Sequence, residues 1–263
     1  MSGLKPAIIE GVYRAVVKPA LFHRDPEEVH ERVTRLGKRL GLSKVGRGVT
    51  KTLFSFQHPM LEGNVCGIAF KNPIGLAAGF DKNGVLTDIL PSVGFGFEEI
   101  GSVTARPCAG NARPRLWRLP HSQSLAVHYG LANEGSEVIA ERLAHKKFAF
   151  PVGVSIAETN ELVRGDADSG IADYRETYEK FSAAEIGDYY TLNISCPNTS
   201  GGESFTNPKK LDRLLRGIFA FPKKRPIFIK LSADLTHAEI DGILEVARAH
   251  RIDGVIATNL TRV

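Results

Sequence analysis

The stretch DYYTLNISCPNT, residues 188–199, joins a strand sequence to a polar turn. Its first part, residues 188–192, is aromatic and β-branched, which favours extended structure. Its second part carries two asparagines, a serine, a cysteine and a proline. In an α/β barrel the chemically active side chains lie where the strands end. The alternative is a structural cysteine beside a turn, since free cysteine is among the most buried residue types.

Strands and helices alternate along the rest of the chain, which favours a parallel sheet with crossover helices. The predicted strands are 72–78, 97–103, 151–156, 189–194, 226–231 and 254–258, and the predicted helices are 134–143, 172–181, 208–219 and 237–249. A TIM (β/α)₈-type barrel has eight strands, so we expect an α/β barrel that is incomplete at its C-terminus. Because an open barrel exposes a sheet edge, a non-catalytic truncated scaffold protein is an alternative to an enzyme.

The N-terminal part predicts a small helical extension. Apolar residues recur at helical spacing over residues 5–22, with basic residues off that face. Asp25 and Pro26 predict the start of a second helix that ends near Gly41. A basic linker over 43–51 and a short hairpin within 54–70 follow. We therefore expect a helical extension over residues 1–50 and a barrel over residues 51–263.

Composition narrows the classes of function. The net charge of +5 permits an anionic partner, but no basic cluster carries a nucleic-acid-binding motif. Cys66, Cys108 and Cys196 have no CxxC spacing, so neither a disulfide framework nor a zinc site is expected. No apolar run reaches the length of roughly 18 residues that a membrane-spanning helix needs.

Several motifs give the chain a resemblance to the dihydroorotate dehydrogenases. The resemblance implies an FMN enzyme that oxidises dihydroorotate to orotate in pyrimidine (UMP) biosynthesis. The segment around Arg115 and the helical extension resemble class 2, the quinone-reducing, membrane-associated branch. The motifs follow the family's order and cover most of the chain: 75–84, 94–104, 110–120, 193–199 and 229–231.

The resemblance also implies roles for individual residues. Cys196 stands at the position of the catalytic base, where class 2 usually has serine and class 1 has cysteine. A thiol titrates nearer neutrality than a hydroxyl, so it takes a proton with less help. Thr199 matches a proton-relay position, with turn capping as its alternative. Lys82 is expected to meet the substrate carboxylate, or else to be a solvated surface lysine. No metal is expected.

Further positions match residues that bind the flavin, the pyrimidine or the quinone in this family. Lys230 is expected beside the flavin ring, where a cation stabilises negative charge. Arg118 resembles an arginine on the quinone side, with an ordinary surface arginine as its alternative. The cofactor set is Ala78, Gly79, Lys82, Ser102, Ser155, Asn193, Lys230 and Thr258; the substrate set is Lys82, Tyr129, Gly130, Leu131, Asn193, Asn198 and Asn259.

Some positions depart from the class 2 pattern. Val127 and Ser155 each stand where class 2 has an asparagine, and the loop from Gly130 to Asn133 looks more like class 1. Asn133 is a candidate to replace part of the lost bonding. A flavin oxidoreductase acting on another dihydropyrimidine is therefore an alternative.

The class 2 likeness also implies peripheral contact of the N-terminal helices with the cytoplasmic face of a membrane. A surface helix packed on its own domain is the alternative.

Overall fold

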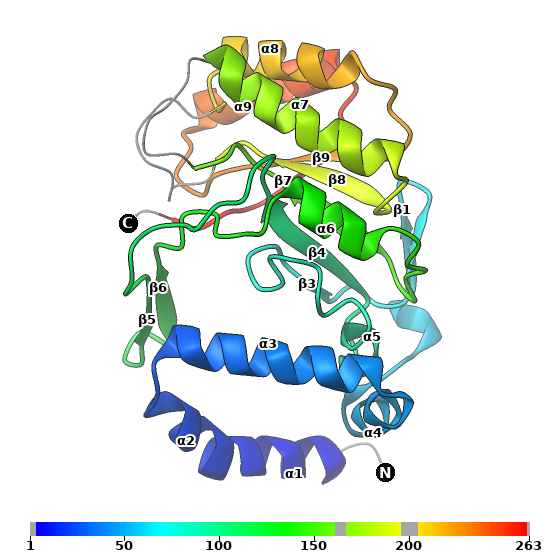
Figure 1. Cartoon of the computed structure of the whole chain (residues 1–263), viewed down its shortest axis with the longest axis vertical. Coiled ribbons are helices and arrows are strands. Elements are labelled where there is room, and N and C mark those ends of the chain that lie inside the picture. The colour runs from blue at the N-terminus through cyan, green and yellow to red at the C-terminus, as the bar shows by residue number, and fades with distance from the viewer. Residues whose placement is uncertain (1–3, 161–166, 196–204, 262–263) are drawn as a thin grey trace.

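A parallel six-stranded sheet forms the centre of the computed structural model, which describes residues 4–160, 167–195 and 205–261 (Figure 1). The strand order is β10-β9-β8-β7-β4-β3, and every neighbouring pair is parallel. The predicted parallel sheet with crossover helices is therefore confirmed. The strands are β3 Gly75–Leu76, β4 Phe97–Val103, β7 Val152–Ile156, β8 Tyr189–Asn193, β9 Ile227–Lys230 and β10 Gly254–Ile256.

The main core lies between this sheet and the helices that cover its outer face. These helices are α6 Ser136–Leu143, α7 Ala167–Ala183, α8 Pro208–Phe219 and α9 His237–Ala249. Outward side chains of the strands that join this core include Val154, Leu192 and Ile229, all fully buried. Successive strand side chains point to opposite faces. The inner face carries aromatic side chains near the amino ends of the strands, where the rings of Tyr189 and Phe228 meet at 5.5 Å, and polar side chains further along. There the Glu99 carboxylate accepts a 2.7 Å hydrogen bond from the Thr191 hydroxyl.

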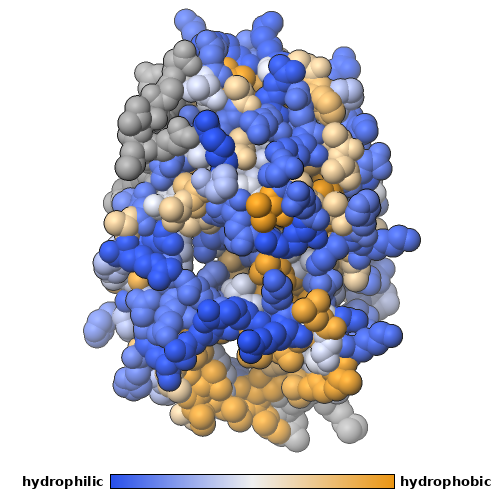
Figure 2. Space-filling view, viewed as in Figure 1, coloured by the Kyte–Doolittle hydropathy of each residue, from blue (hydrophilic) through white to orange (hydrophobic). Residues whose placement is uncertain are grey.

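The N-terminal helices stack on the opposite side of the molecule from α8 and α9 (Figure 1). They are α1 Leu4–Val12, a π-helical turn η1 Tyr13–Val17, α2 Lys18–Phe22 and α3 Pro26–Leu42. As predicted, the Asp25 carboxylate caps α3, accepting from the backbone N–H groups of Glu27 and Glu28 at 2.9 Å. Figure 2 shows apolar surface concentrated at this end. Among the described residues, no helix has the length and apolar character needed to cross a bilayer.

The predicted basic linker over 43–51 is wrong, because these residues lie in helix α4, Lys44–Phe54. Gly46 and Gly48 disfavour a helix on intrinsic propensity. The Ser43 hydroxyl nevertheless caps the helix by accepting from the Gly46 N–H at 3.1 Å. A Cβ at position 46 would lie 2.7 Å from the carbonyl oxygen of Leu40. Glycine therefore allows α4 to turn closely against the end of α3, a tertiary constraint that the local sequence does not display.

The remaining differences concern short elements. The strand predicted over 72–78 is only two residues long, and the antiparallel pair β5 Leu116–Leu119 and β6 Ser124–Val127 was not predicted. The expected hairpin within 54–70 is present as β1 Gly63–Val65 and β2 Ile68–Phe70. A 3₁₀ turn, η2 Pro59–Leu61, precedes it, and α5 Leu90–Val93 precedes β4.

A buried ion pair fastens α3 to the segment that leads into β5. Arg115 Nη2 lies 2.8 Å from Glu27 Oε1, and both residues are buried. The same guanidinium donates from Nη1 to the carbonyl oxygens of Ala109 and Asn111, at 2.7 and 2.9 Å. Arg115 therefore connects α3 to the loop before β5. Removing one partner of such a pair leaves an uncompensated buried charge.

We predict that Arg115→Met lowers the free energy of unfolding by about 3 kcal/mol, because buried Glu27 loses its buried partner and keeps the exposed Arg113, whose Nη2 lies 3.0 Å from Glu27 Oε1. Arg32→Met is the matched control, since Arg32 forms an exposed i,i+4 pair with Glu28. It should cost about 0.5 kcal/mol. Chemical denaturation followed by circular dichroism measures both. Equal losses for the two variants would contradict a structural role for the buried pair.

Candidate functional site

A cavity of about 700 Å³ lies at the carboxyl ends of the central strands. Residues that follow or end β3, β4, β8, β9 and β10 form one wall, and α3 with the β5–β6 hairpin forms the other. This is the end of a parallel α/β sheet where ligands bind. Of the residues predicted from the sequence, those that line it are Ala78, Gly79, Lys82, Ser102, Arg118, Tyr129, Gly130, Leu131, Asn193, Lys230, Thr258 and Asn259.

A chain of hydrogen bonds fixes the polar inner end of the cavity. Asn259 Nδ2 donates to Asn193 Oδ1 at 2.9 Å, and Asn193 Nδ2 donates to Ser102 Oγ at 2.9 Å. The Ser102 hydroxyl in turn lies 2.8 Å from that of Ser155. An asparagine amide has two N–H donors, so this chain uses one donor of Asn193 and holds the other in a fixed direction. The side chains are thus oriented before any ligand binds.

Lys230 brings a positive charge to the same inner wall. It ends β9, is buried, and lies beside Asn193 in the register of the parallel β8–β9 pair. Burial raises the pKa of Glu99, one layer deeper in the sheet, while the charge of Lys230 opposes that rise. A buried ammonium at a strand end stabilises negative charge that a ligand brings into the cavity.

Lys82 lies over the face of Tyr129. Its Nζ is 3.8 Å from the ring centroid, and the guanidinium carbon of Arg115 is 4.9 Å from the same centroid. Burial lowers the pKa of Lys82 to about 8, a shift that Glu27 opposes and Arg115 reinforces. Burial likewise raises the pKa of Tyr129 to about 12. The arrangement holds a partly desolvated amine at the cavity wall, where an anionic ligand group would restore its charge.

The backbone next to Lys82 permits close approach of a ligand. Gly79 has a φ of +107°, and no atom lies within 4 Å of the position that a Cβ would occupy. Its N–H donates to the Gly101 carbonyl oxygen at 2.7 Å, which holds the loop against β4. Small side chains at Ala77 and Ala78 continue this surface. A flat ring can therefore lie against the backbone here.

The outer end of the cavity is apolar. Its wall is made by side chains of the N-terminal helices and of the β5–β6 hairpin. Arg118 is a polar exception: its Nη1 donates to the Arg24 carbonyl oxygen at 2.8 Å, and its guanidinium carbon lies 4.8 Å from the Phe22 ring centroid. The cavity thus has an apolar passage that leads to a polar inner end. The apolar side chains are Leu21, Phe22, Val29, Val33, Leu116 and Leu125.

Other predicted residues lie outside the cavity wall. Ser155 is fully buried, and its hydroxyl lies 2.8 Å from that of Ser102, which lines the cavity. Asn133 is buried and donates to the Thr104 hydroxyl and the Leu131 carbonyl oxygen, at 2.8 and 2.7 Å. Its amide therefore serves the loop rather than the cavity. Cys196, Asn198 and Thr199 lie outside the described residues.

Sequence reasoning did not single out His30, which lines the cavity from α3. Its Nε2 lies 2.9 Å from the Phe80 carbonyl oxygen, and its ring meets the Phe80 ring edge-on at 4.7 Å. Burial and then the charge of Lys82 lower the pKa of His30. Position 30 belongs to a helix far from the barrel motifs in sequence, so no local pattern marked it.

A parallel sheet with a cation-lined cavity at the carboxyl ends of its strands is the arrangement found in enzymes of the α/β-barrel class. A family model described as "Dihydroorotate dehydrogenase" matches residues 60–263. The chain belongs to the dihydroorotate dehydrogenase family. The expected family and barrel type are therefore confirmed.

Individual members of this family are similar to the chain in sequence and in structure. The chain is 39% identical over 254 residues to "Dihydroorotate dehydrogenase (quinone)" of Natronomonas pharaonis, covering 95% of this chain and 69% of the relative. It is 39% identical over 246 residues to the protein of the same name from Haloarcula marismortui, covering 94% and 68%. The ligand-free crystal structure of an Eimeria tenella enzyme, "DHODH", superposes with a TM-score of 0.76 at 27% identity, covering 90% of this chain and 69% of that one.

We predict that Lys82 changes from charged to neutral as the pH rises through about 8. Its amine should therefore acylate half-maximally near that pH, because only the neutral form is nucleophilic. Labelling with acetic anhydride across a pH series, read by peptide mass spectrometry, measures this. Exposed Lys44 of α4 serves as the reference in the same digest. Labelling of Lys82 that is still rising steeply at pH 10 would contradict the burial of its amine.

Proposed function

We propose that this chain oxidises dihydroorotate to orotate, with FMN as hydride acceptor and a quinone as the final acceptor. The observation that carries the proposal is the meeting of two lysines and two asparagines, Lys82, Lys230, Asn193 and Asn259, in one cavity of a chain of this family. The family implies a flavin cofactor in general; FMN is the form that we propose.

The residues present fit the ring system of a flavin. Gly79 leaves open space above its backbone, and Lys230 places a cation at the carboxyl end of β9, in the same cavity. Ser102 and Thr258 add hydroxyl groups, and Asn193 adds an amide. A flat heterocycle with alternating donors and acceptors matches this set. The ring-binding residues that we propose are Ala78, Gly79, Lys82, Ser102, Asn193, Lys230 and Thr258, with Ser155 supporting Ser102.

The reaction removes a proton and a hydride from neighbouring carbons of the pyrimidine, which then share a double bond. A bound FMN supplies the acceptor for the hydride. We propose that Lys82 pairs with the substrate carboxylate, and that Asn193 and Asn259 hold the ring. Cys196 takes the proton and Thr199 relays it, with Asn198 a further ring contact. Tyr129, Gly130 and Leu131 close the substrate side of the cavity.

The apolar outer end of the cavity suits a quinone. A quinone has a polar ring and an apolar tail, and the passage between α3 and the β5–β6 hairpin offers Arg118 to the ring and aliphatic side chains to the tail. We propose that the electrons leave by this route. The proposal assigns residues 1–50 to the quinone side and 51–263 to the flavin-binding barrel, although α4 crosses that boundary.

We also propose peripheral contact of the N-terminal helices with the cytoplasmic face of a membrane. Ile8, Val12 and Val16 are 57%, 53% and 64% exposed, so this apolar stripe is not covered by the protein itself. Apolar side chains of an interfacial helix enter the boundary between headgroups and acyl chains.

Anaerobic spectroscopy tests the proposed reaction. We predict that the purified chain, supplied with FMN, shows flavin absorption that bleaches on addition of dihydroorotate. Dihydrouracil, which lacks the carboxylate, should bleach it far more slowly. Lys82→Gln should reduce the preference for dihydroorotate by about 100-fold, since it removes a charge-assisted contact of about 2–3 kcal/mol.

Lys44→Gln is the matched control, because it removes the same charge from an exposed side chain of α4. It should leave the preference unchanged. A flavin that binds but bleaches equally with both substrates would point to another dihydropyrimidine, the alternative that Val127 raises by placing an apolar side chain in the cavity. A chain that binds no flavin would contradict the proposed reaction.

Vesicle flotation tests the membrane contact. We predict that the chain floats with anionic vesicles and that Val12→Glu with Val16→Glu abolishes most of this binding, because each change places a charge in the apolar stripe. Val138→Glu is the control, since Val138 is 42% exposed on α6, away from these helices. Flotation that survives the double substitution would exclude this surface as the contact.

A further inference from the structure

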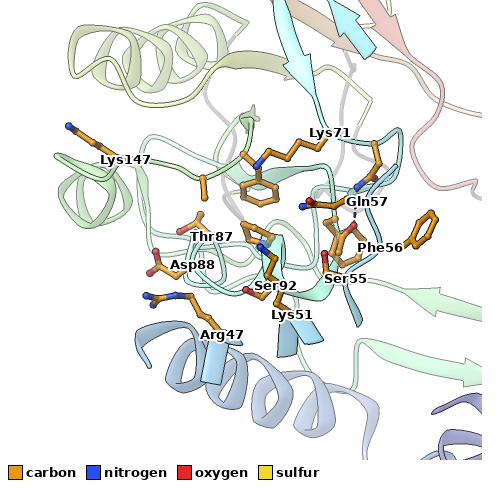
Figure 3. Close-up of a pocket in the computed structure, with 16 residues that line it drawn as sticks. Arg47, Lys51, Ser55, Phe56, Gln57, Lys71, Thr87, Asp88, Ser92 and Lys147 are labelled. Atoms are coloured by element: carbon orange, nitrogen blue, oxygen red, sulfur yellow. Dashed lines mark hydrogen bonds between the residues drawn. The ribbon is translucent and has the colours of Figure 1, made fainter. Parts of the chain in front are cut away.

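A second cavity, of about 400 Å³, lies at the other end of the sheet (Figure 3). Its wall includes Lys71, Phe95 and Phe150, which come shortly before β3, β4 and β7 respectively. It therefore adjoins the amino ends of the strands, whereas the site described above adjoins their carboxyl ends. Helix α4 closes one side with Arg47 and Lys51. We call this the basic cavity.

Positive charge dominates the basic cavity. Arg47, Lys51, Lys71 and Lys147 line it, and Asp88 is the acid among its lining residues. The Asp88 carboxylate already forms an ion pair with Lys146 at 2.9 Å. No ion pair with a described residue neutralises Lys51 or Lys71. The cavity therefore keeps an excess of positive charge that the surrounding protein does not balance.

The lysine side chains of the basic cavity point in different directions. Figure 3 shows Lys51 and Lys71 reaching toward the middle of the cavity from different elements, whereas Lys147 points away from it. Two ammonium groups aimed at one space repel each other, and an anion between them would replace that repulsion by attraction. Lys51 and Lys71 are therefore the pair that defines a binding position.

The rest of the wall supplies hydroxyl donors and an apolar floor. Ser92 and Thr87 line the same cavity and both are buried; the Thr87 hydroxyl also accepts from Lys146 Nζ at 3.3 Å. Asn72 Nδ2 donates to the Gly94 carbonyl oxygen at 3.0 Å, which joins the loop before β3 to the loop before β4. Phe95 and Phe150 contribute ring surface. The wall thus combines charge, hydroxyl groups and shape in a concave space.

We infer that the basic cavity binds the phosphate group of an anionic ligand. Lysine ammonium groups bind phosphate as point charges, and hydroxyl groups complete the contacts to its oxygens. A phosphate monoester carries close to two negative charges, which matches two facing ammonium groups. The volume lies within the range of small-molecule sites, about 300–1,000 Å³. The ligand is a soluble phosphate monoester or the lipid phosphatidic acid, whose headgroup is also a phosphate monoester; both present the same group. This inference does not depend on the proposed reaction.

Binding measurements on the full chain test the inference. We expect calorimetry with inorganic phosphate and with phenyl phosphate to show saturable binding, and Lys51→Gln with Lys71→Gln to weaken it at least about tenfold. The double variant Lys147→Gln with Lys44→Gln is the control of equal charge change, on side chains that do not point into the cavity; it should change the affinity less than about twofold. All four lysines are exposed, so these substitutions should leave the fold intact.

The outcomes distinguish a soluble ligand from a lipid headgroup, and the basic cavity from the cavity at the carboxyl ends of the strands. Binding of the soluble probes that the double substitution removes supports a phosphate-ester ligand. Binding only to phosphatidic acid vesicles, again removed by the double substitution, supports a lipid headgroup. Two results would overturn the inference: no probe binding that depends on Lys51 and Lys71, or phosphate binding that is lost instead in Lys82→Gln with Lys230→Gln, which would place it in the other cavity.

Discussion

The Arg115 guanidinium is the contact on which the site's geometry depends. It pairs with buried Glu27 of α3, donates to two carbonyl groups of the loop before β5, and lies over the ring of Tyr129. Lys82 lies over the same ring. One buried cation thus joins the N-terminal helices, the hairpin and the cavity wall, three parts of the chain that are far apart in sequence. The pair therefore lies next to the cavity wall, where the charges of Glu27 and Arg115 have opposite effects on the pKa of Lys82.

The sheet separates two environments. At the carboxyl ends of its strands, a cavity grades from an apolar passage to a polar inner wall with Lys230 and Asn193. At the amino ends, a basic cavity is bounded by α4 and the loops before β3, β4 and β7. In a parallel sheet all strand ends of one kind meet at one side, so residues dispersed along the sequence converge twice, once at each end. The proposed role of the first cavity rests on the family relationship, and that of the second rests on its charge and shape.

Much of this was readable from the sequence, for identifiable reasons. Helices α8 and α9 have the predicted bounds, because their apolar residues recur at helical spacing and Asn207 and Thr236 cap their N-termini. Strand β4 also has the predicted bounds. Site residues at strand ends, such as Lys230 and Asn193, were predicted because they belong to motifs that resemble the dihydroorotate dehydrogenases and that follow predicted strands. Helix α4 was missed because Gly46 serves a tertiary contact, and the stacking of Lys82 on Tyr129 joins residues that no local pattern links. Long-range packing, rather than local propensity, decides these features.

The most direct test of the central claim, that Lys82, Asn193 and Asn259 form the pyrimidine site, is a crystal structure of this chain with orotate bound. The geometry predicts the orotate carboxylate within hydrogen-bond distance of Lys82 Nζ, and the ring N–H and carbonyl groups facing the two asparagine amides. Orotate seated away from Lys82, whether in the apolar passage or in the basic cavity, would contradict the claim and separate the family's fold from the proposed chemistry of this chain.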